Sequence, residues 1–181
     1  MMHRRNLPHW CVDGAAIFLT WRLFGTLPNS AKRVLDGRAF READRELDRA
    51  ATGPSWLSQG SVAECVAQTI ERAETERRLC SLPAFVVMPN HVHILISPRT
   101  ELHCITKWIK GTSARGANLL LGRTGSPFWQ DESFDHWVRD HWEFEKVRRY
   151  IENNPVSAGL VPEPERWPYS SACRQKLEVT G

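Results

Sequence analysis

The sequence predicts an α+β domain built around a mainly antiparallel sheet. Its 181 residues, 41% of them hydrophobic and 25% charged, are typical of a globular chain that buries a core. Strand-like runs alternate irregularly with helix-like segments, which favours an α+β architecture. We expect a single domain over residues 1–181, with residues 155–181 as a C-terminal tail packed on it.

The first half of the chain contains one strand-like and two helix-like segments. Residues 15–23, AAIFLTWRL, are β-branched and aromatic enough for a first strand, and Gly25 breaks the pattern after it. Residues 36–51 are rich in Arg and Glu and predict an exposed helix. A second helix is expected over residues 61–79. Its buried stripe would consist of Val62, Cys65, Val66, Thr69 and Ile70.

Residues 85–96, FVVMPNHVHILI, are strand-forming on both sides of Pro89 and Asn90. Proline lacks the donor that a central strand uses, so this stretch predicts either one bulged strand or a tight hairpin. Because side chains alternate along a strand, His91 and His93 point to the same face. Two adjacent imidazoles can form a hydrogen-bonded core pair, a metal site or half of an acid–base apparatus.

The second half is expected to contain two longer helices separated by a short strand. The first helix covers residues 101–121, the strand lies within residues 122–140, and the last helix covers residues 141–154, where Pro155 ends it. The first of these helices would turn four residues inward: Leu102, Ile105, Trp108 and Ile109. The tail would pack through Leu160, Val161 and Trp167.

Cysteine usage and hydropathy exclude several classes of protein. Five cysteines without a CxxC pair argue against a disulfide framework or a zinc ribbon and fit a reducing cytoplasm. No apolar run is long enough to span a bilayer, and no apolar segment with a cleavage site follows the opening MMHRRNLPHW. We therefore expect a cytoplasmic protein without a membrane partner.

A basic stretch lies between Glu101 and Asp131, where the sequence has no acidic residue. Its cations are suited to phosphate contacts, so the stretch is a candidate nucleic-acid surface. An ordinary solvated helix face is the alternative. The basic residues are Lys107, Lys110, Arg115 and Arg123.

Tyr150 and Asn154 lie close together in the last predicted helix, in the stretch RRYIENNPV. A separation of four residues leaves two helical side chains about 40° apart on one face. Alone, such residues are an ordinary surface or cap pair. Together with two strand histidines, an amide oxygen gives a three-ligand site without net ligand charge. A divalent ion there would keep its positive charge and open positions for phosphate oxygens.

Tyr150 is the candidate nucleophile of such a site. A phenol with a pKa of about 10 attacks poorly at neutral pH, but it becomes a reasonable nucleophile when a metal polarises the phosphorus. The resulting phosphotyrosine would conserve the energy of the broken phosphodiester, which suits strand transfer better than hydrolysis. We expect activity with Mg²⁺ or Mn²⁺, because Mg²⁺ favours oxygen ligands and Mn²⁺ accepts imidazole more readily.

The stretches MPNHVHIL and RRYIENNPVSAGLV together resemble the REP-associated tyrosine transposases, a branch of the single-tyrosine HUH transposases. The stretches WIKGTSARGANLLLGRTGSPFWQDESFDHWVRD and ERWPYSSA are also similar to this family. The resemblance implies Tyr150 as nucleophile, His91 and His93 as metal ligands, and Asn154 at the third-ligand position. It also implies a ferredoxin-like antiparallel sheet with helices packed on it, a central histidine strand, and the tyrosine helix laid across it.

The resemblance further implies a reaction and a substrate. The relatives act on single-stranded DNA hairpins such as repetitive extragenic palindromes (REP), retain a 5′-phosphotyrosine and release a 3′-OH. We therefore expect a metal-dependent single-strand DNA endonuclease and strand transferase. The alternatives are a hairpin-binding module without efficient cleavage and a small metal-dependent phosphoesterase that forms no covalent adduct. The sequence leaves open whether the protein is a monomer or a homodimer.

Other polar and aromatic residues are weaker candidates. Arg148 and Arg149 flank Tyr150 and would either grip the DNA backbone or remain solvated. Tyr169 lies outside the predicted helices and is expected to be structural. Several tryptophans are able to stack on bases, although the core needs large aromatics more often. The surface or packing residues expected here are His103, His136, His141, Trp108, Trp129 and Trp137.

Overall fold

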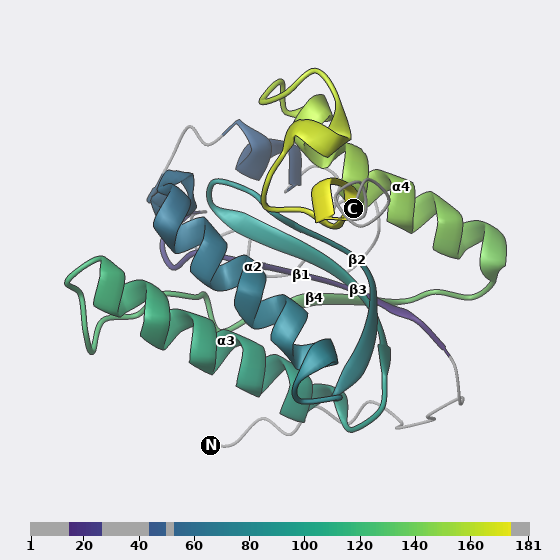
Figure 1. The fold of residues 1–181 in the computed structure, drawn as a ribbon, viewed down its shortest axis with the longest axis horizontal. Helices are drawn as coiled ribbons and strands as arrows, with labels where there is room; N and C mark the ends of the chain where they lie inside the picture. Colours follow the sequence, from purple (N-terminus) through teal and green to yellow (C-terminus); the bar gives the residue numbers. More distant parts are fainter. Residues whose placement is uncertain (1–14, 27–43, 50–52, 175–181) are drawn as a thin grey trace.

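A four-stranded antiparallel sheet forms the centre of the computed structural model, which describes residues 15–26, 44–49 and 53–174 (Figure 1). The strands lie in the order β2-β3-β1-β4, so the strand that carries both histidines is an interior strand. Their bounds are Ile17–Arg22 for β1, Cys80–Val87 for β2, His91–Pro98 for β3 and Phe134–Trp137 for β4.

Helices cover both faces of this sheet (Figure 1). Helix α2 (Gly60–Thr75) and helix α3 (Leu102–Leu120) lie side by side on one face, and helix α4 (His141–Ser157) crosses the other. The chain order β1–α2–β2–β3–α3–β4 is that of the ferredoxin-like fold. The predicted antiparallel α+β architecture is therefore confirmed. The described part of the chain also contains two short 3₁₀ helices, η2 (Trp56–Ser58) and η3 (Pro164–Arg166).

The alternation of side chains along β1 explains the two layers of core. Ile17, Leu19 and Trp21 belong to the larger cluster, under α2 and α3, whereas Phe18 belongs to the smaller one, under α4. Along β3 the same alternation puts Leu95 in the smaller cluster, and it therefore puts His91 and His93 on the α4 face. The confirmed parts of the α2 and α3 stripes, which include Val66, Ile70, Ile105 and Ile109, fill the larger cluster.

Residues 85–96 form the predicted hairpin rather than one bulged strand. Val87 pairs with Val92, and the Met88 N–H donates to the His91 carbonyl at 2.9 Å. Strand β2 begins at Cys80, earlier than the sequence suggested, and a register shift between Ser81 and Ala84 accommodates the intervening proline.

Two predicted helix ends are wrong. Helix α2 ends at Thr75 instead of residue 79, and the chain then turns through Arg78 with a φ of 52°. Helix α4 continues through Pro155 to Ser157, because a proline in the last turn removes only one backbone hydrogen bond. The stop comes from Gly159, whose φ of 72° is a left-handed conformation that glycine adopts without strain.

The segment after α4 lies along the outer edge of β2. The Trp167 indole donates to the Val87 carbonyl at 2.9 Å, and the Val87 N–H donates to the Tyr169 carbonyl at 2.9 Å. The expected packing of Trp167 is thus confirmed, and the backbone at Tyr169 pairs with β2. Leu160 is 41% exposed, so the expectation that it anchors the tail is wrong.

The predicted exposed helix over residues 36–51 is described only at residues 44–49; its other residues lie outside the described part. Residues 44–48 are helical, and both Asp44 and Leu47 are buried, so this face of the helix is not exposed. The described cysteines are free thiols, as expected, while Cys11 lies outside the described residues. Among the helices described, none combines the length and apolarity needed to cross a bilayer.

Gly53 is expected to be the described glycine least tolerant of alanine. Its φ is 80°, and an added Cβ would lie 2.4 Å from the Gly25 carbonyl oxygen. Gly125 has a similar φ of 85° but open space around it, so it is a matched control. We expect Gly125→Ala to lower Tm by about 2–4 °C and Gly53→Ala to lower it at least twice as much, because the clash adds to the conformational cost. Equal shifts in thermal denaturation would contradict the predicted clash.

Candidate active site

The two histidines of β3 face each other in the smaller core cluster. Both are fully buried, and their Nε2 atoms are 3.1 Å apart. Phe18 of β1 stacks on His93 with a centroid distance of 5.6 Å. The sequence prediction that the two imidazoles share one face is confirmed.

The orientation and tautomer of His91 are fixed by Asn90, in the hairpin turn. The Asn90 amide nitrogen donates to the Leu47 carbonyl at 2.8 Å, so its oxygen faces His91 and accepts from Nδ1 at 2.7 Å. His91 therefore presents its Nε2 lone pair to the site. Burial, together with the charge of His93, lowers the pKa of His91 to about 3 and keeps it in this neutral form.

His93 is held by its neighbour across the sheet. Its register partner on β1 is Thr20, whose Oγ1 lies 2.7 Å from His93 Nδ1. The hydrogen bond leaves Nε2 of His93 directed at His91 and at a carboxylate oxygen of Asp44, 3.1 Å away. Each imidazole thus uses one ring nitrogen for orientation and turns the other into the site.

Two carboxylates from the helical residues 44–48 face the histidines. Asp44 Oδ1 is 3.7 Å from His91 Nε2, and Asp48 Oδ1, one turn further along, is 3.8 Å from the same atom. Burial would raise the pKa of Asp44, but the neighbouring side chains of His93, His91 and Asn154 outweigh it and lower that pKa. Burial, reinforced by the charge of Asp44, raises the pKa of Asp48 to about 6. Asp44 is therefore the more readily ionised of the two carboxylates.

Helix α4 brings Tyr150 to this carboxylate. Asp140 caps the N-terminus of the helix, because its side chain accepts from the Glu143 N–H at 2.8 Å, and the buried Ile151 anchors the helix on the sheet. The Tyr150 hydroxyl donates to Asp44 Oδ2. The Tyr150 ring also packs edge-on against His93, with a centroid distance of 5.7 Å. A tyrosine hydroxyl from one helix and two imidazoles from the sheet thus meet at one aspartate.

Asn154 lies one turn after Tyr150, is 2% exposed and hydrogen-bonds to Asp44. Its Oδ1 has no hydrogen-bond donor among the described residues, and the same is true of Asp44 Oδ1 and Asp48 Oδ1. Buried oxygens without donors are costly unless a cation compensates them. Ligand atoms of Asp44, His91 and His93 lie within 4.8 Å of one another. This donor set of imidazole nitrogen and side-chain oxygen suits Mg²⁺ or Mn²⁺.

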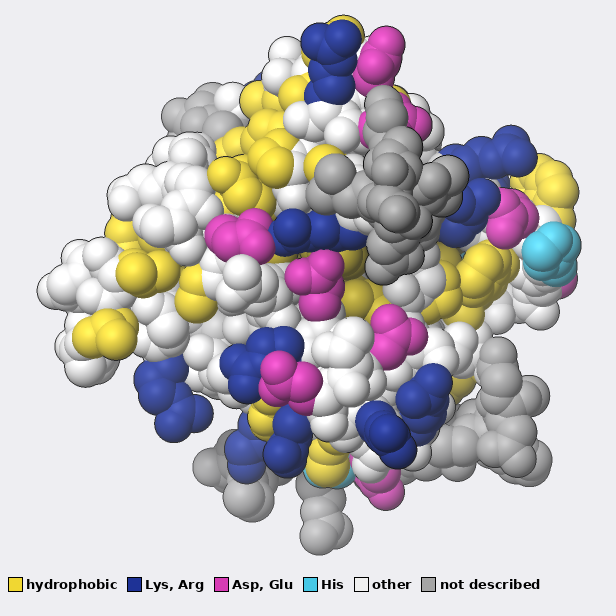
Figure 2. Space-filling view, viewed as in Figure 1, with side chains coloured by type: hydrophobic (Ala, Val, Ile, Leu, Met, Phe, Trp, Pro, Cys, Tyr) yellow, Lys and Arg dark blue, Asp and Glu magenta, His cyan; other side chains and the backbone are white. Residues whose placement is uncertain are grey.

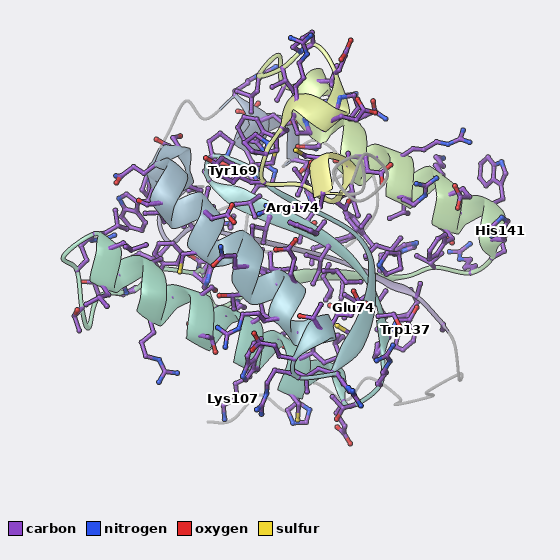
Figure 3. All side chains as sticks on the ribbon, viewed as in Figure 1. Glu74, Lys107, Trp137, His141, Tyr169 and Arg174 are labelled. Carbon is purple, nitrogen blue, oxygen red and sulfur yellow. The ribbon has the colours of Figure 1, made fainter. Side chains whose placement is uncertain are left out.

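The basic residues of α3 lie in the other layer of the molecule. Lys107 and Arg115 are exposed, and Lys107 projects outward from α3 (Figure 3). Several Lys and Arg side chains line the lower edge of the face that α3 forms (Figure 2). Lys110 instead donates its ammonium to the Gln130 and Asp131 carbonyls, at 2.7 and 3.1 Å. Its nitrogen is therefore engaged in holding the chain before β4.

The two arginines beside Tyr150 differ in their surroundings. Arg148 forms ion pairs with Glu145 at 2.9 Å and Glu152 at 3.4 Å, whereas Arg149 is exposed on α4. The other candidates have surroundings of their own. Trp129 lies in the larger core, Trp108 packs against that core, and Trp137 is 43% exposed. His103 pairs with Glu101, His136 pairs with Glu143, and His141 is exposed.

Four residues of the site were missed by sequence reasoning: Asp44, Asp48, Asn90 and Thr20. Asp44, Leu47 and Asp48 have the i, i+3, i+4 spacing of one helix face, which was the available signal for a buried acidic face. Asn90 was considered only as a turn residue, and nothing near Thr20 in the sequence indicates that its partner is a histidine.

The chain was compared with known families and structures. The profile of the family "Transposase IS200 like" matches residues 55–154. A solved structure of a REP-associated tyrosine transposase bound to a REP hairpin is similar, with a TM-score of 0.57 and 19% identity over 96% of this chain and 84% of that chain. Another, a candidate transposase from Deinococcus radiodurans R1, has a TM-score of 0.38 and 19% identity over 85% of this chain and 98% of that one. No curated protein matches.

Proposed function

Because this chain belongs to the IS200-like transposase family, we propose that it cleaves single-stranded DNA at hairpins through a covalent bond to Tyr150. The observation that carries the proposal is a convergence of groups. The hydroxyl of Tyr150, from α4, contacts the same carboxylate that faces His91 and His93, from β3. A nucleophile and a set of metal-ligating atoms lie together, as a transesterification requires.

We assign the metal site to His91, His93, Asn154 and Asp44. The fit rests on the donorless buried oxygens of Asn154 and Asp44 and on the two ring nitrogens turned toward them. When bound, Mg²⁺ or Mn²⁺ would polarise the phosphodiester and stabilise the charge that develops during attack. Asn90 and Thr20 orient the imidazoles, and Phe18, Phe134 and Phe144 belong to the hydrophobic cluster on the same face of the sheet.

The reaction exchanges one phosphodiester for another. The Tyr150 oxygen forms a bond to phosphorus and loses its proton to solvent, while the bond between phosphorus and the 3′ oxygen breaks. The 3′ oxygen leaves with the bonding electron pair and takes a proton from water. The 5′ phosphate stays on Tyr150, and attack by another 3′-OH reverses these steps and joins the strand. No bond energy is lost to hydrolysis, which suits strand transfer.

The proposed substrate is a hairpin in single-stranded DNA, met in the cytoplasm. The similar solved structure holds a REP hairpin, and the fold that it shares with this chain extends over nearly the whole length. The exposed cations Lys107, Arg115 and Arg149 would supply contacts to DNA phosphates, and Lys110 and Arg148 would do so only by releasing their present partners.

The test is a covalent-adduct assay with hairpin-bearing single strands from the gene's own genomic neighbourhood. A strand labelled on the 3′ side of the cleavage site should migrate with the protein on a denaturing gel, and only when Mn²⁺ or Mg²⁺ is present. Tight hairpin binding without cleavage would instead favour a binding module. Cleavage without any adduct would favour a phosphoesterase in which Tyr150 is merely structural.

The basic surface of α3 makes a separate prediction about affinity. Changing Lys107 and Arg115 together to glutamine should weaken hairpin binding and flatten its salt dependence. The slope of log affinity against log salt should fall by about 0.7 per lost contact to a single strand, or about 0.9 per contact to duplex. Cleavage at saturating DNA should persist, because both residues lie across the sheet from Tyr150.

A salt titration of this double variant beside the parent decides the matter. Arg149→Gln, on the helix of the proposed nucleophile, is the comparison for a cation close to the site. Parallel lines for the α3 variant and the parent would mean that the basic side chains of α3 face water and do not hold the DNA.

A further inference from the structure

We propose that Asp44 is shared between the metal and the nucleophile, with Oδ1 as an anionic metal ligand and Oδ2 as the anchor of the Tyr150 hydroxyl. The inference rests on the proposed function and deepens it. Binding of the metal and the position of the Tyr150 hydroxyl would then depend on each other. The residue comes from a part of the chain that precedes the segment matched by the family profile.

The two oxygens of the carboxylate have different partners. Oδ1 lies 3.1 Å from His93 Nε2 and 3.7 Å from His91 Nε2, and it has no hydrogen-bond donor among the described residues. Oδ2 accepts the hydrogen bond of Tyr150. One rigid planar group therefore contacts both functional elements, and a shift of one oxygen must move the other.

The surroundings of Asp44 favour the binding of a cation. Its side chain is 3% exposed, and its Oδ1 has no hydrogen-bond donor among the described residues. The partners that the structure gives this carboxylate are two imidazoles, a phenol and an amide. Buried oxygens without hydrogen-bond donors are costly, and a divalent ion among them would offset that cost.

The helical turn that carries Asp44 is held against the hairpin between β2 and β3. Leu47 is buried, and its carbonyl accepts the hydrogen bond of Asn90, the residue that also orients His91. The hairpin turn thus ties the helical residues 44–48 to β3. Groups that support a ligand in this way typically change metal affinity by 10–100-fold when removed.

If Asp44 contacts both groups, the Tyr150 hydroxyl and metal binding should be thermodynamically coupled. Removing the Tyr150 hydroxyl should loosen Asp44 and weaken metal binding, although the hydroxyl itself is not a ligand. The effect should exist only while Asp44 is present, because coupling between two groups is carried by the residue that contacts both.

The experiment measures Mn²⁺ affinity by calorimetry on the DNA-free protein, in a double-variant cycle. The four proteins are the parent, Asp44→Ala, Tyr150→Phe and the double variant. We expect Asp44→Ala to weaken Mn²⁺ binding by at least about tenfold and Tyr150→Phe by several-fold, up to about tenfold. In the Asp44→Ala background Tyr150→Phe should have no further effect. Tyr169→Phe, at the only other tyrosine, should leave the affinity unchanged.

Asp48→Asn is the control for charge alone. Asp48 lies on the same helical turn and near the same histidine, and it is not one of the three residues whose ligand atoms cluster within 4.8 Å. If Asp44 acts only through its charge, Asp44→Asn and Asp48→Asn should weaken binding equally; if Asp44 is a ligand, its variant should be clearly the weaker binder. Circular dichroism confirms that each variant is folded, and Asp44→Asn replaces Asp44→Ala if the latter is not.

Three results would overturn the proposal: parental Mn²⁺ affinity in Asp44→Ala and Asp44→Asn, equal effects of Asp44→Asn and Asp48→Asn, or the same Tyr150→Phe effect in both backgrounds. None of them depends on DNA cleavage. If the parent forms no DNA adduct but the cycle shows coupling, the proposed function fails and the shared carboxylate stands. If adducts form and no coupling exists, only the inference fails.

Discussion

Replacing Tyr150 by phenylalanine is expected to abolish the covalent DNA adduct at saturating metal while leaving hairpin binding nearly intact. The substitution removes only the hydroxyl, and the ring keeps its edge-on contacts with Phe18 and His93. The proposed nucleophilic oxygen is then missing, so the expected loss of adduct is complete and not graded. The measurement is a denaturing gel for the adduct together with a filter-binding or anisotropy assay for the hairpin.

Tyr169→Phe is the matched control for this variant, since the protein has only two tyrosines. Tyr169 contributes its backbone carbonyl to the edge of β2 and packs on Trp167, away from the histidine pair. Its variant should form adduct at the parental rate. Adduct in Tyr150→Phe but not in Tyr169→Phe would transfer the nucleophile assignment to the second tyrosine.

Alanine at either His91 or His93 is expected to suppress cleavage at least about a hundredfold, because a lost ligand reduces both metal affinity and geometry. Chelation with EDTA should have the same effect on the parent, and added Mn²⁺ should restore the chelated parent but not the variants. The measurement is single-turnover cleavage of a labelled hairpin. His136→Ala is the control, because that histidine belongs to β4 and pairs with Glu143 of α4, whereas His91 and His93 belong to β3.

Full activity of the parent in EDTA, with no trace metal detectable, would contradict the metal assignment. The histidines would then serve as acid–base groups or as a buried polar pair, the two other possibilities that the HVH pattern allows. The depressed pKa of His91 argues against a proton-shuttling role for that residue near neutral pH, because it would remain deprotonated throughout.

The architecture follows from local patterns. Runs of β-branched and aromatic residues set the strands at residues 17–22 and 91–98, and apolar residues at helical spacing set α2 and α3. Both were therefore predictable from short windows of sequence. The ends of the helices were less predictable. Whether Pro155 stops a helix depends on the next turn, where the left-handed Gly159 supplies the actual stop.

The site, like the fold, was predictable only in part. His91 and His93 share a face because of a two-residue period, and Tyr150 and Asn154 share one because of a four-residue spacing. That the two pairs meet depends on α4 crossing the sheet, and the resemblance, not the spacing, indicated it. Asp44 was assigned to an exposed helix because its neighbours Arg45, Glu46 and Arg49 are charged. Only tertiary contacts distinguish the buried acids on that helix from its solvated ones.

The alternation along β3 has an evolutionary consequence. One face of the strand carries the proposed chemistry, and the other face contributes Val92, Ile94 and Ile96 to the larger cluster under α2 and α3. Substitutions that reshape the α4 layer around the histidines can therefore accumulate while the opposite layer keeps the scaffold folded. The residues around the site can then change while the residues that stabilise the other face of the sheet stay the same.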